Sequence, residues 1–267
     1  MLRSDPLTLV DDDRYPIADL DDPRAVSLVA ECRRQLAGTG ACELPGFLNR
    51  RATAQLAAEG DTLAPHAHRS RVEGTCYLDL PDESCPDGHP KRVLGPNALG
   101  AVAYDRFPPD SGLRALYEWP ALHGFVAAML GEASVYPYAD PLGALNLAVM
   151  GDGDELAWHF DQTDFVVSLA LVSAEHGGAF EYVPRIRSAT DERYDDVAAV
   201  LAGDTSRVQL IPMVPGTLLL FEGRYSLHRV TPIRGDRARL VALLAFDTKP
   251  DTTSSELLRL VRYGRAG

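Results

Sequence analysis

After Gly131 the chain changes into a series of short strand-like runs, and this change limits the possible fold more than any other feature of the sequence. The runs are rich in Leu, Val, Ala and Phe, and clusters of Gly, Pro and Asp separate them. Short runs at such spacing are typical of a jelly roll, in which two sheets face each other as a double-stranded β-helix. The runs expected to be strands are 144–150, 156–161, 165–172, 179–183, 208–213, 217–221, 225–230 and 239–246.

The sequence before Gly131 has a different pattern. Asp22 and Pro23 open a segment with apolar residues at helical spacing that stops at Gly38, which predicts a helix over 23–37. Pro120 divides a later apolar segment into two short helices. The other expected elements are a strand at 41–44, a helix at 50–62, the two helices between 111 and 130, and a short helix within 190–201.

Together these patterns predict one domain with a mainly β fold and flanking helices. At 267 residues the chain is long enough to bury a full core. We expect a helical elaboration with a lid loop over 1–135, the jelly-roll core over 136–250, and a tail over 251–267.

The stretch 64–96 has few periodic apolar residues and is rich in His, Gly, Pro and Asp. A long irregular segment in a compact domain is more often a functional loop than a linker. Two interpretations stay open for it. It is either a solvated surface loop or a lid that covers a bound substrate with His66, His68 and Tyr77.

Composition excludes several classes of function. The formal net charge of −12 and the pI of about 5.0 argue against general binding to nucleic acid or to an anionic membrane. We find neither a signal-peptide pattern nor an apolar stretch of about 20 residues, so a cytoplasmic protein is expected. Cys32, Cys42, Cys76 and Cys85 lack a CxxC spacing and are expected to be reduced thiols. No pattern predicts a particular oligomeric state.

His159 and Asp161 lie two residues apart near the end of an expected strand. Alternate residues of a strand face the same side, so this imidazole and carboxylate can be directed to one point. His228, on a later expected strand, would complete a two-histidine, one-carboxylate face that suits iron(II) and leaves positions open for further ligands. The alternative is a buried, hydrogen-bonded histidine with Asp161 as a turn residue, because an HxD pair is common by chance.

Arg237 and Arg239 open the last expected strand, on the same side of it as Val241. A guanidinium at the start of an apolar strand is unfavourable unless it meets a carboxylate. The sequence offers no evident acidic partner, so a dicarboxylate ligand is one way to supply it. The alternative is a strand end at the surface, with both arginines solvated.

Between Ala139 and Pro250 these motifs resemble the Fe(II)- and 2-oxoglutarate-dependent oxygenases. The resemblance covers the second half of the chain, and the sequence is similar to bacterial members that act on small molecules, including those that tailor amino acids in natural-product pathways. The matching segments are His159-Phe160-Asp161, Gly177-Gly178-Ala179-Phe180-Glu181, Pro215-Gly216, Leu227-His228-Arg229-Val230-Thr231-Pro232 and Arg239.

The resemblance implies a role for each matching residue. His159, Asp161 and His228 would bind Fe(II), and 2-oxoglutarate would chelate the metal through its 1-carboxylate and 2-keto oxygens. Its 5-carboxylate would pair with Arg239, although the family also uses an earlier position that keeps Arg237 as an alternative. Two weaker candidates for hydrogen bonds to the cosubstrate are Asn146 and Thr231.

The same resemblance predicts the type of reaction. Halogenating members replace the metal-binding carboxylate by a small residue, which frees a position for chloride, whereas Asp161 fills that position here. We therefore expect an oxidoreductase that uses O₂ and 2-oxoglutarate to oxidise an unactivated C–H bond and releases succinate and CO₂. Hydroxylation is the default outcome, and desaturation or oxidative cyclisation needs no different ligands.

The expected substrate is a small polar molecule, an amino acid or a derivative in a biosynthetic pathway. Its binding residues should lie around the mouth of the barrel, where arginines suit a carboxylate or phosphate. The alternative for each arginine is a solvated side chain. The candidates are Arg224, Tyr182, Arg185 and Arg187. Two other functions stay open: a non-catalytic jelly-roll module that binds a small ligand, and a cupin-type metalloenzyme that uses no 2-oxoglutarate.

Overall fold

The computed structural model describes residues 5–267, and its strands form a curled sheet together with one short two-stranded ribbon. All strand pairs are antiparallel. The strands of the curled sheet are β1 (Ala41–Leu44), β2 (His68–Gly74), β3 (Gly95–Val102), β5 (Leu145–Met150), β6 (Glu155–His159), β7 (Val166–Val172), β8 (Phe180–Val183), β9 (Gln209–Ile211), β10 (Leu218–Phe221), β11 (Leu227–Val230) and β12 (Arg239–Leu244). The ribbon pairs β4 (Tyr136–Pro137) with β13 (Phe246–Asp247).

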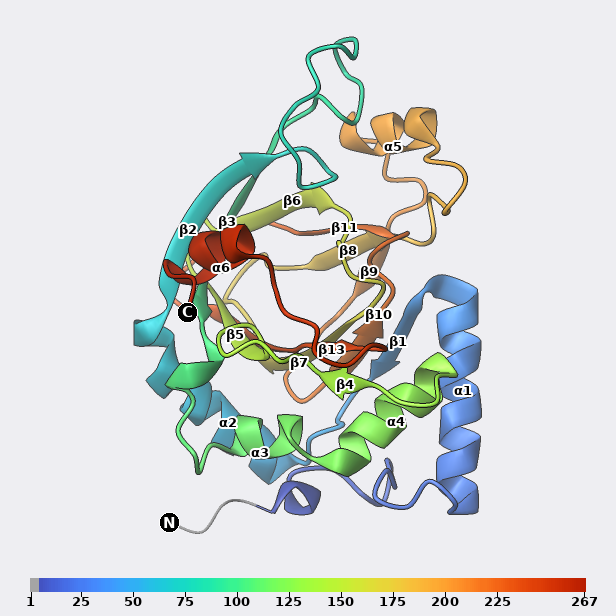
Figure 1. Ribbon diagram of the computed structural model, residues 1–267, viewed down its shortest axis with the longest axis vertical. Helices are drawn as coiled ribbons and strands as arrows, with labels where there is room; N and C mark the ends of the chain where they lie inside the picture. Colours follow the sequence, from blue (N-terminus) through green and yellow to red (C-terminus); the bar gives the residue numbers. More distant parts are fainter. Residues whose placement is uncertain (1–4) are drawn as a thin grey trace.

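The order of strands in the sheet is β1-β10-β7-β12-β5-β3-β6-β11-β8-β9, and β2 pairs with β3 at the side. The last residues of β3 pair with β5 and its middle residues pair with β6, so β3 connects a larger group of strands to a smaller one. Figure 1 shows the two groups facing each other, with β5 and β7 on one side and β6, β8 and β11 on the other. The fold is thus a double-stranded β-helix, and the sequence prediction is confirmed.

Local chemistry explains where several of the helices begin and end. The side chain of Asp22 accepts a hydrogen bond at the start of the first helix, which ends at Gly40 in a left-handed conformation. Asn49 and Ser255 cap two other helices in the same way. The helices are α1 (Pro23–Thr39), α2 (Arg50–Leu63), α3 (Gly112–Tyr117), α4 (Pro120–Leu130), α5 (Tyr194–Leu201) and α6 (Glu256–Tyr263), with short 3₁₀ turns at Pro6–Thr8, Ala64–His66 and Tyr104–Arg106.

Alternation along the strands divides the apolar residues between the interior and the outer faces of the barrel. In β5, Leu147 and Val149 point outward into the core that α1 to α4 cover, whereas Ala148 and Met150 point inward. On the smaller group of strands, α5 and the segment 75–94 cover an outer cluster that includes Phe160 and Leu227. The interior of the barrel is therefore lined by a different set of side chains from the outer faces. Polar residues in this mostly apolar interior are candidates for binding a ligand.

The sequence predicted most elements, but it was wrong about part of the first half. The stretch 64–96 was expected to be irregular, yet 68–74 forms β2, paired along its length with β3. The side chains of β2 are mostly exposed, so it lacks the apolar alternation that marks a strand. The first half thus contributes β1, β2 and β3 to the sheet as well as helices.

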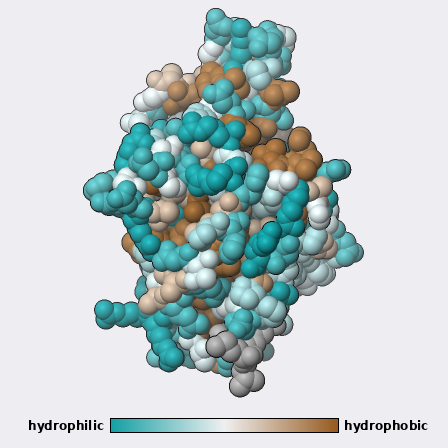
Figure 2. Space-filling view, turned by 90° about the vertical axis from the view of Figure 1, so that its left-hand side faces the viewer, coloured by the Kyte–Doolittle hydropathy of each residue, from teal (hydrophilic) through white to brown (hydrophobic). Residues whose placement is uncertain are grey.

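The expected tail also contains a helix. In α6 the apolar residues recur at helical spacing, yet Leu257 and Leu260 are exposed while Tyr263 is buried against β3 and the loop after it. Figure 2 shows the side of the molecule with β2 and α6, where hydrophilic residues predominate and apolar residues gather in smaller patches. Within residues 5–267 no helix has both the length and the apolar character needed to cross a membrane.

Candidate metal centre

His159 and His228 lie opposite each other on neighbouring strands. His159 ends β6 and His228 is in β11, and the two are paired in the sheet register, with their rings 4.2 Å apart between centroids. In both residues Nδ1 contacts the backbone carbonyl two positions earlier, that of Ala157 at 2.8 Å and that of Ser226 at 3.0 Å. A proton on Nδ1 that is donated to a carbonyl leaves the Nε2 lone pair free for a metal.

Asp161 completes the group from a position just past the strand. The expectation that it shares a strand with His159 is wrong, because β6 ends at His159. The backbone N–H of Asp161 instead donates to the carbonyl of Gly223, in the loop between β10 and β11, at 3.1 Å. The carboxylate therefore points to the histidines because two loops hold it, not because of strand alternation.

The three ligand atoms fit a single metal ion. Oδ1 of Asp161 lies 3.5 Å from Nε2 of His228 and 4.0 Å from Nε2 of His159, and all three atoms lie within 4.8 Å of one another. Two neutral imidazoles and a carboxylate on one face of an ion are the donor set of non-haem iron(II) sites. Among the described residues this is the only cluster of His, Cys, Asp or Glu with such geometry.

The electrostatics of the group favour a cation. Burial, and after it the neighbouring His228, lower the pKa of His159 to about 4. Burial alone would raise the pKa of Asp161, yet the nearby imidazoles, His228 foremost, hold it below its usual range. For His228, burial opposes the charge but the carboxylate of Asp161 raises the pKa. The carboxylate thus stays ionised, and a bound dication would take the place of the proton that it attracts.

Arg239 is a buried cation in the same interior. It opens β12, and Val241 and Leu243 on the same side of that strand pack in a cluster with Phe221, whose ring lies 4.9 Å from that of His228. The guanidinium makes one long contact, with Sδ of Met150 at 3.9 Å, and no described carboxylate pairs with it. Burial lowers its pKa to about 10, so it is still charged at neutral pH.

Asn146 shares this interior. It lies on β5 beside Leu243 in the register, it is buried, and within residues 5–267 its Oδ1 has no hydrogen-bond partner. Asn146 and Arg239 thus lie on the same interior face, four residues apart along the paired strands, and a polar ligand could supply partners to both.

Sequence reasoning missed two further buried polar residues of the strands. Ser168 faces Leu243 across β7 and β12, so that Ser168, Leu243 and Asn146 form one row across three strands. Asn97 lies on β3, a strand that the sequence did not predict. A single serine inside the run Val166–Val172 was a signal that could have identified Ser168, since the other residues of that run are apolar.

Arg237 and Arg239, the two alternatives for the 5-carboxylate of 2-oxoglutarate, lie in different surroundings, and so does the weaker candidate Thr231. Arg237 is half exposed and pairs with Asp61 of α2 at 3.0 Å, outside the barrel. Arg239 is the arginine that faces inward. Thr231 lies just after β11, where its Oγ1 accepts a hydrogen bond from the N–H of Ala179 at 2.9 Å.

The arginines expected to bind substrate already have partners in the protein. Arg185 donates to the carbonyls of Leu36 and Ala37 at the end of α1, at 2.6 and 2.7 Å, and pairs with Glu222 at 2.6 Å. Carbonyls at a helix C-terminus attract cations, so this contact holds α1 against the barrel.

Arg187 and Tyr182 are likewise engaged. The guanidinium of Arg187 lies 4.0 Å from the centre of the Phe160 ring and pairs with Glu192 at 2.9 Å. Tyr182 is buried in the interior and donates its hydroxyl to Gln209 at 2.9 Å.

Arg224 lies closest in sequence to the ligands and lines a pocket of about 220 Å³. It contacts Asp164 and the carbonyl of Gln162, which directly follows Asp161. The other residues that line this pocket are Tyr138, Thr163, Phe165, Phe246, Asp247 and Thr248.

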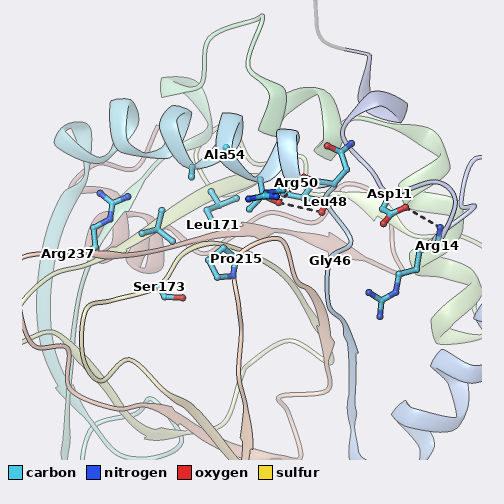
Figure 3. A pocket seen from close by; sticks show the side chains of 14 residues that line it. Asp11, Arg14, Gly46, Leu48, Arg50, Ala54, Leu171, Ser173, Pro215 and Arg237 are labelled. Carbon is cyan, nitrogen blue, oxygen red and sulfur yellow. Dashed lines mark hydrogen bonds between the residues drawn. The ribbon is translucent and has the colours of Figure 1, made fainter.

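A larger hollow, of about 620 Å³, lies away from the ligands, between the start of α2, the end of β7 and Pro215 (Figure 3). Arg14, Arg50 and Arg237 line it, but the described residues around it include none of the three ligands. Its size therefore does not identify it as the reactive site. The smaller pocket is not lined by the three ligands either, but Gln162 and Arg224, which line it, directly follow Asp161 and Gly223 in the chain, so it is the better candidate.

Comparison with known proteins shows a family and a shared fold. Residues 101–258 match the model of a family described as HalD, Halogenase D. AviO1 from Streptomyces viridochromogenes Tue57 has 20% sequence identity over 83% of this chain and 95% of its own, with a TM-score of 0.56. A 2OG-Fe(II) oxygenase family oxidoreductase from Burkholderia pseudomallei has 15% identity over 83% and 91% of the two chains, with a TM-score of 0.52.

A third solved structure with a similar fold has ligands bound. HygX from Streptomyces hygroscopicus, with nickel, 2-oxoglutarate and hygromycin B bound, has 14% identity over 81% of this chain and 85% of its own, with a TM-score of 0.50. At these identities the likeness establishes the fold alone. No curated protein matches the chain.

Proposed function

Because this chain belongs to the Halogenase D family and carries a complete set of two imidazoles and a carboxylate, we propose that it is an Fe(II)- and 2-oxoglutarate-dependent oxygenase. Its reaction is the oxidation of an unactivated C–H bond in a small polar substrate. The observation that carries this proposal is the position of the Asp161 carboxylate, whose Oδ1 lies within 4.0 Å of Nε2 of both histidines.

Each part of the interior has a role in this reaction. His159, Asp161 and His228 hold the iron, and Arg239 pairs with the far carboxylate of 2-oxoglutarate. When bound, the iron and its cosubstrate supply the oxidising chemistry, in which O₂ is consumed and 2-oxoglutarate is converted to succinate and CO₂. The aromatic rings around His228, Phe180 at 5.6 Å and Phe221 at 4.9 Å, limit the access of water to that ligand.

Asn146 and Ser168 orient the cosubstrate from the row that they form across the strands. The unsatisfied Oδ1 of Asn146 needs a hydrogen-bond donor, and an ordered water or a substrate N–H is a suitable one, since 2-oxoglutarate at neutral pH has acceptors only. The amide nitrogen of the same side chain is then available to the cosubstrate.

A zwitterionic substrate, an amino acid or a derivative, fits the pocket beside Asp161. That pocket carries carboxylates from Asp164 and Asp247 that suit the amino group of such a substrate, and a guanidinium from Arg224 that would exchange its contact with Asp164 for the substrate carboxylate. Its volume of about 220 Å³ suits a small molecule rather than a polymer. Such a substrate is consistent with a role in the biosynthesis of a natural product.

Halogenation is the second candidate function, because the name of the matching family favours it. A halide needs a position on the metal, however, and in this chain the carboxylate of Asp161 lies where it takes one of the protein's ligand positions. We therefore place oxygenation before halogenation.

The test is a screen of amino acids and their derivatives with Fe(II), 2-oxoglutarate, O₂ and chloride, followed by mass analysis. Substrate-dependent release of succinate with the gain of one oxygen atom supports hydroxylation, and loss of two hydrogens supports desaturation or cyclisation. Replacement of a hydrogen by chlorine would establish the halogenase instead.

The same screen separates the other classes. A binding module would release no succinate with any substrate, and a metalloenzyme of the cupin type would act without 2-oxoglutarate. In the absence of O₂, Fe(II) and 2-oxoglutarate should give the visible absorption of their chelate in the wild-type protein. An unaltered absorption in the His228→Ala variant would contradict the assigned metal centre.

A further inference from the structure

Gly223 contacts Asp161, both through a backbone hydrogen bond and through the position of the Asp161 carboxylate. Its carbonyl accepts the hydrogen bond from the N–H of Asp161 at 3.1 Å, and it is buried in the loop between β10 and β11. A Cβ placed on Gly223 would overlap Oδ2 of Asp161 and would lie 2.5 Å from Cγ and 2.9 Å from Cβ of that residue. Real Cβ atoms do not come this close to other heavy atoms, so the carboxylate occupies the space that a side chain at 223 would need.

Asp161 cannot avoid such a side chain and still bind metal. A change of the χ1 rotamer would move the carboxylate out of the space that the new Cβ needs, and because this rotation leaves Cβ of Asp161 in place, the 2.9 Å contact would need a shift of the backbone as well. That rotation would carry Oδ1 away from Nε2 of His228 and of His159, which lie 3.5 and 4.0 Å from it.

The loop that carries Gly223 is also fixed on both sides, so it cannot easily recede. The N–H of Glu222 donates to the carbonyl of Gly40 at 2.8 Å. On the other side, Nε of Arg187 donates to the carbonyl of Arg224 at 2.8 Å, and Arg187 itself lies against the ring of Phe160, next to Asp161. The two segments around the metal are therefore tied to each other.

The backbone does not explain the glycine. Several glycines of this chain have a positive φ that favours glycine, but the φ of Gly223 lies outside that region. An alanine could adopt the same backbone conformation, so the lack of a side chain has a steric reason.

We propose that Gly223 is a positioning residue, which reserves the space in which Asp161 reaches the metal. The residue at 223 thus determines whether the chain can present a carboxylate as its third ligand. This inference rests on the proposed metal centre and adds to it a residue that touches neither the metal nor the substrate.

The test compares Gly223→Ala in two backgrounds, wild type and Asp161→Gly, by titration with Co(II) followed by its visible absorption. In the wild-type background we expect Co(II) to bind about 10- to 100-fold more weakly, the range for loss of a group that orients a ligand. In the Asp161→Gly background, where the space is empty, the same substitution should leave the affinity unchanged. Gly151→Ala is the matched control, because a Cβ there would meet its nearest atom, Oδ2 of Asp154, at 4.0 Å and its φ is also outside the positive region.

The outcomes distinguish the inference from the function on which it rests. Wild-type affinity in Gly223→Ala, or an equal loss in both backgrounds, would overturn the role of Gly223 while the metal centre stands. A wild-type protein that binds no Co(II) would overturn both. If Gly223→Ala does not fold, a folded Asp161→Gly/Gly223→Ala protein still supports the steric explanation, and an unfolded one refutes it.

Discussion

The interior of the barrel and its rim both carry arginines, but their surroundings are opposite. Arg239 in the interior is buried, and no described carboxylate pairs with it. Arg185 and Arg187 at the rim each contact a carboxylate and a backbone carbonyl. The difference separates two uses of one residue type: the rim arginines connect segments of the protein, and the interior arginine has a charge left for a ligand.

Other polar groups of the interior also lack close partners among the described residues, as Arg239 does. Around the metal centre, Oδ1 of Asp161 is 3.5 and 4.0 Å from the two Nε2 atoms, and Oδ1 of Asn146 has no hydrogen-bond partner in the part of the chain that the structure describes. A fold normally satisfies buried polar groups, and a buried charge left unpaired is unfavourable by several kcal/mol. An unpaired buried guanidinium and an unsatisfied amide oxygen on the same interior face are therefore a stronger sign of a binding site than the arginines at its mouth.

The largest effect should come from the metal ligands. We expect His228→Ala to lower substrate-dependent succinate release by at least about 1,000-fold, because the metal contributes several kcal/mol to the reaction. The release is measured with the best substrate of the screen. Arg229→Ala is the matched control, since the next side chain in β11 points to the outer face, where Arg229 pairs with Glu181. If His228→Ala keeps its substrate-dependent succinate release, His228 is not an essential metal ligand, and the interior no longer differs from the rim in its importance for the reaction.

Arg239 should give the next largest effect. Charge-assisted hydrogen bonds contribute about 1.5–3 kcal/mol, so Arg239→Met should raise the KM for 2-oxoglutarate about 10- to 100-fold. Without cosubstrate the same substitution should raise the free energy of unfolding, because it removes an unpaired buried charge. Denaturant titration measures this second effect.

Arg237→Met is the control for Arg239, because Arg237 pairs with Asp61 outside the barrel. It should leave the KM for 2-oxoglutarate unchanged. If Arg237→Met raises that KM and Arg239→Met does not, the two assignments exchange places and the inward position of Arg239 needs another explanation.

A rim arginine should affect stability rather than binding. Arg185→Ala leaves the carbonyls of Leu36 and Ala37 without their donor, so we expect the free energy of unfolding to fall by about 1 kcal/mol. Denaturant titration measures the change, and the KM for the substrate should stay as in the wild type. A raised KM with unchanged stability would return Arg185 to the role of substrate residue that the sequence suggested.

The sequence predicted the barrel because its strands carry strong local signals. Runs such as 166–172 are apolar and bounded by turn residues, and they fold as expected. Strand β2 escaped prediction because its residues are mostly exposed, and its pairing with β3 is a tertiary contact that no local pattern records. Sequence patterns do not predict a strand whose stability comes mainly from pairing with another part of the chain.

The ligands show the same limit within the site. The HxD spacing pointed to His159 and Asp161, but by an argument from strand alternation that does not apply to Asp161. What holds that carboxylate is the loop at Gly223, more than 60 residues later in the chain. The sequence indicated that Arg239 lacked a partner, whereas only the structure revealed that the rim arginines have theirs.

The smallest effect should come from the outer face of the metal-binding strands. Arg229 lies over the ring of Trp158 at 4.7 Å and pairs with Glu181 at 2.6 Å, on the side of β11 opposite His228. Partly exposed ion pairs contribute about 0.2–1 kcal/mol, so Arg229→Ala should lower the free energy of unfolding by no more than that. Because strand alternation separates the two faces, Co(II) affinity should not change. A weaker affinity for Co(II) in Arg229→Ala would mean that the outer face helps to position His228. Residues of the outer face would then count among those that support metal binding.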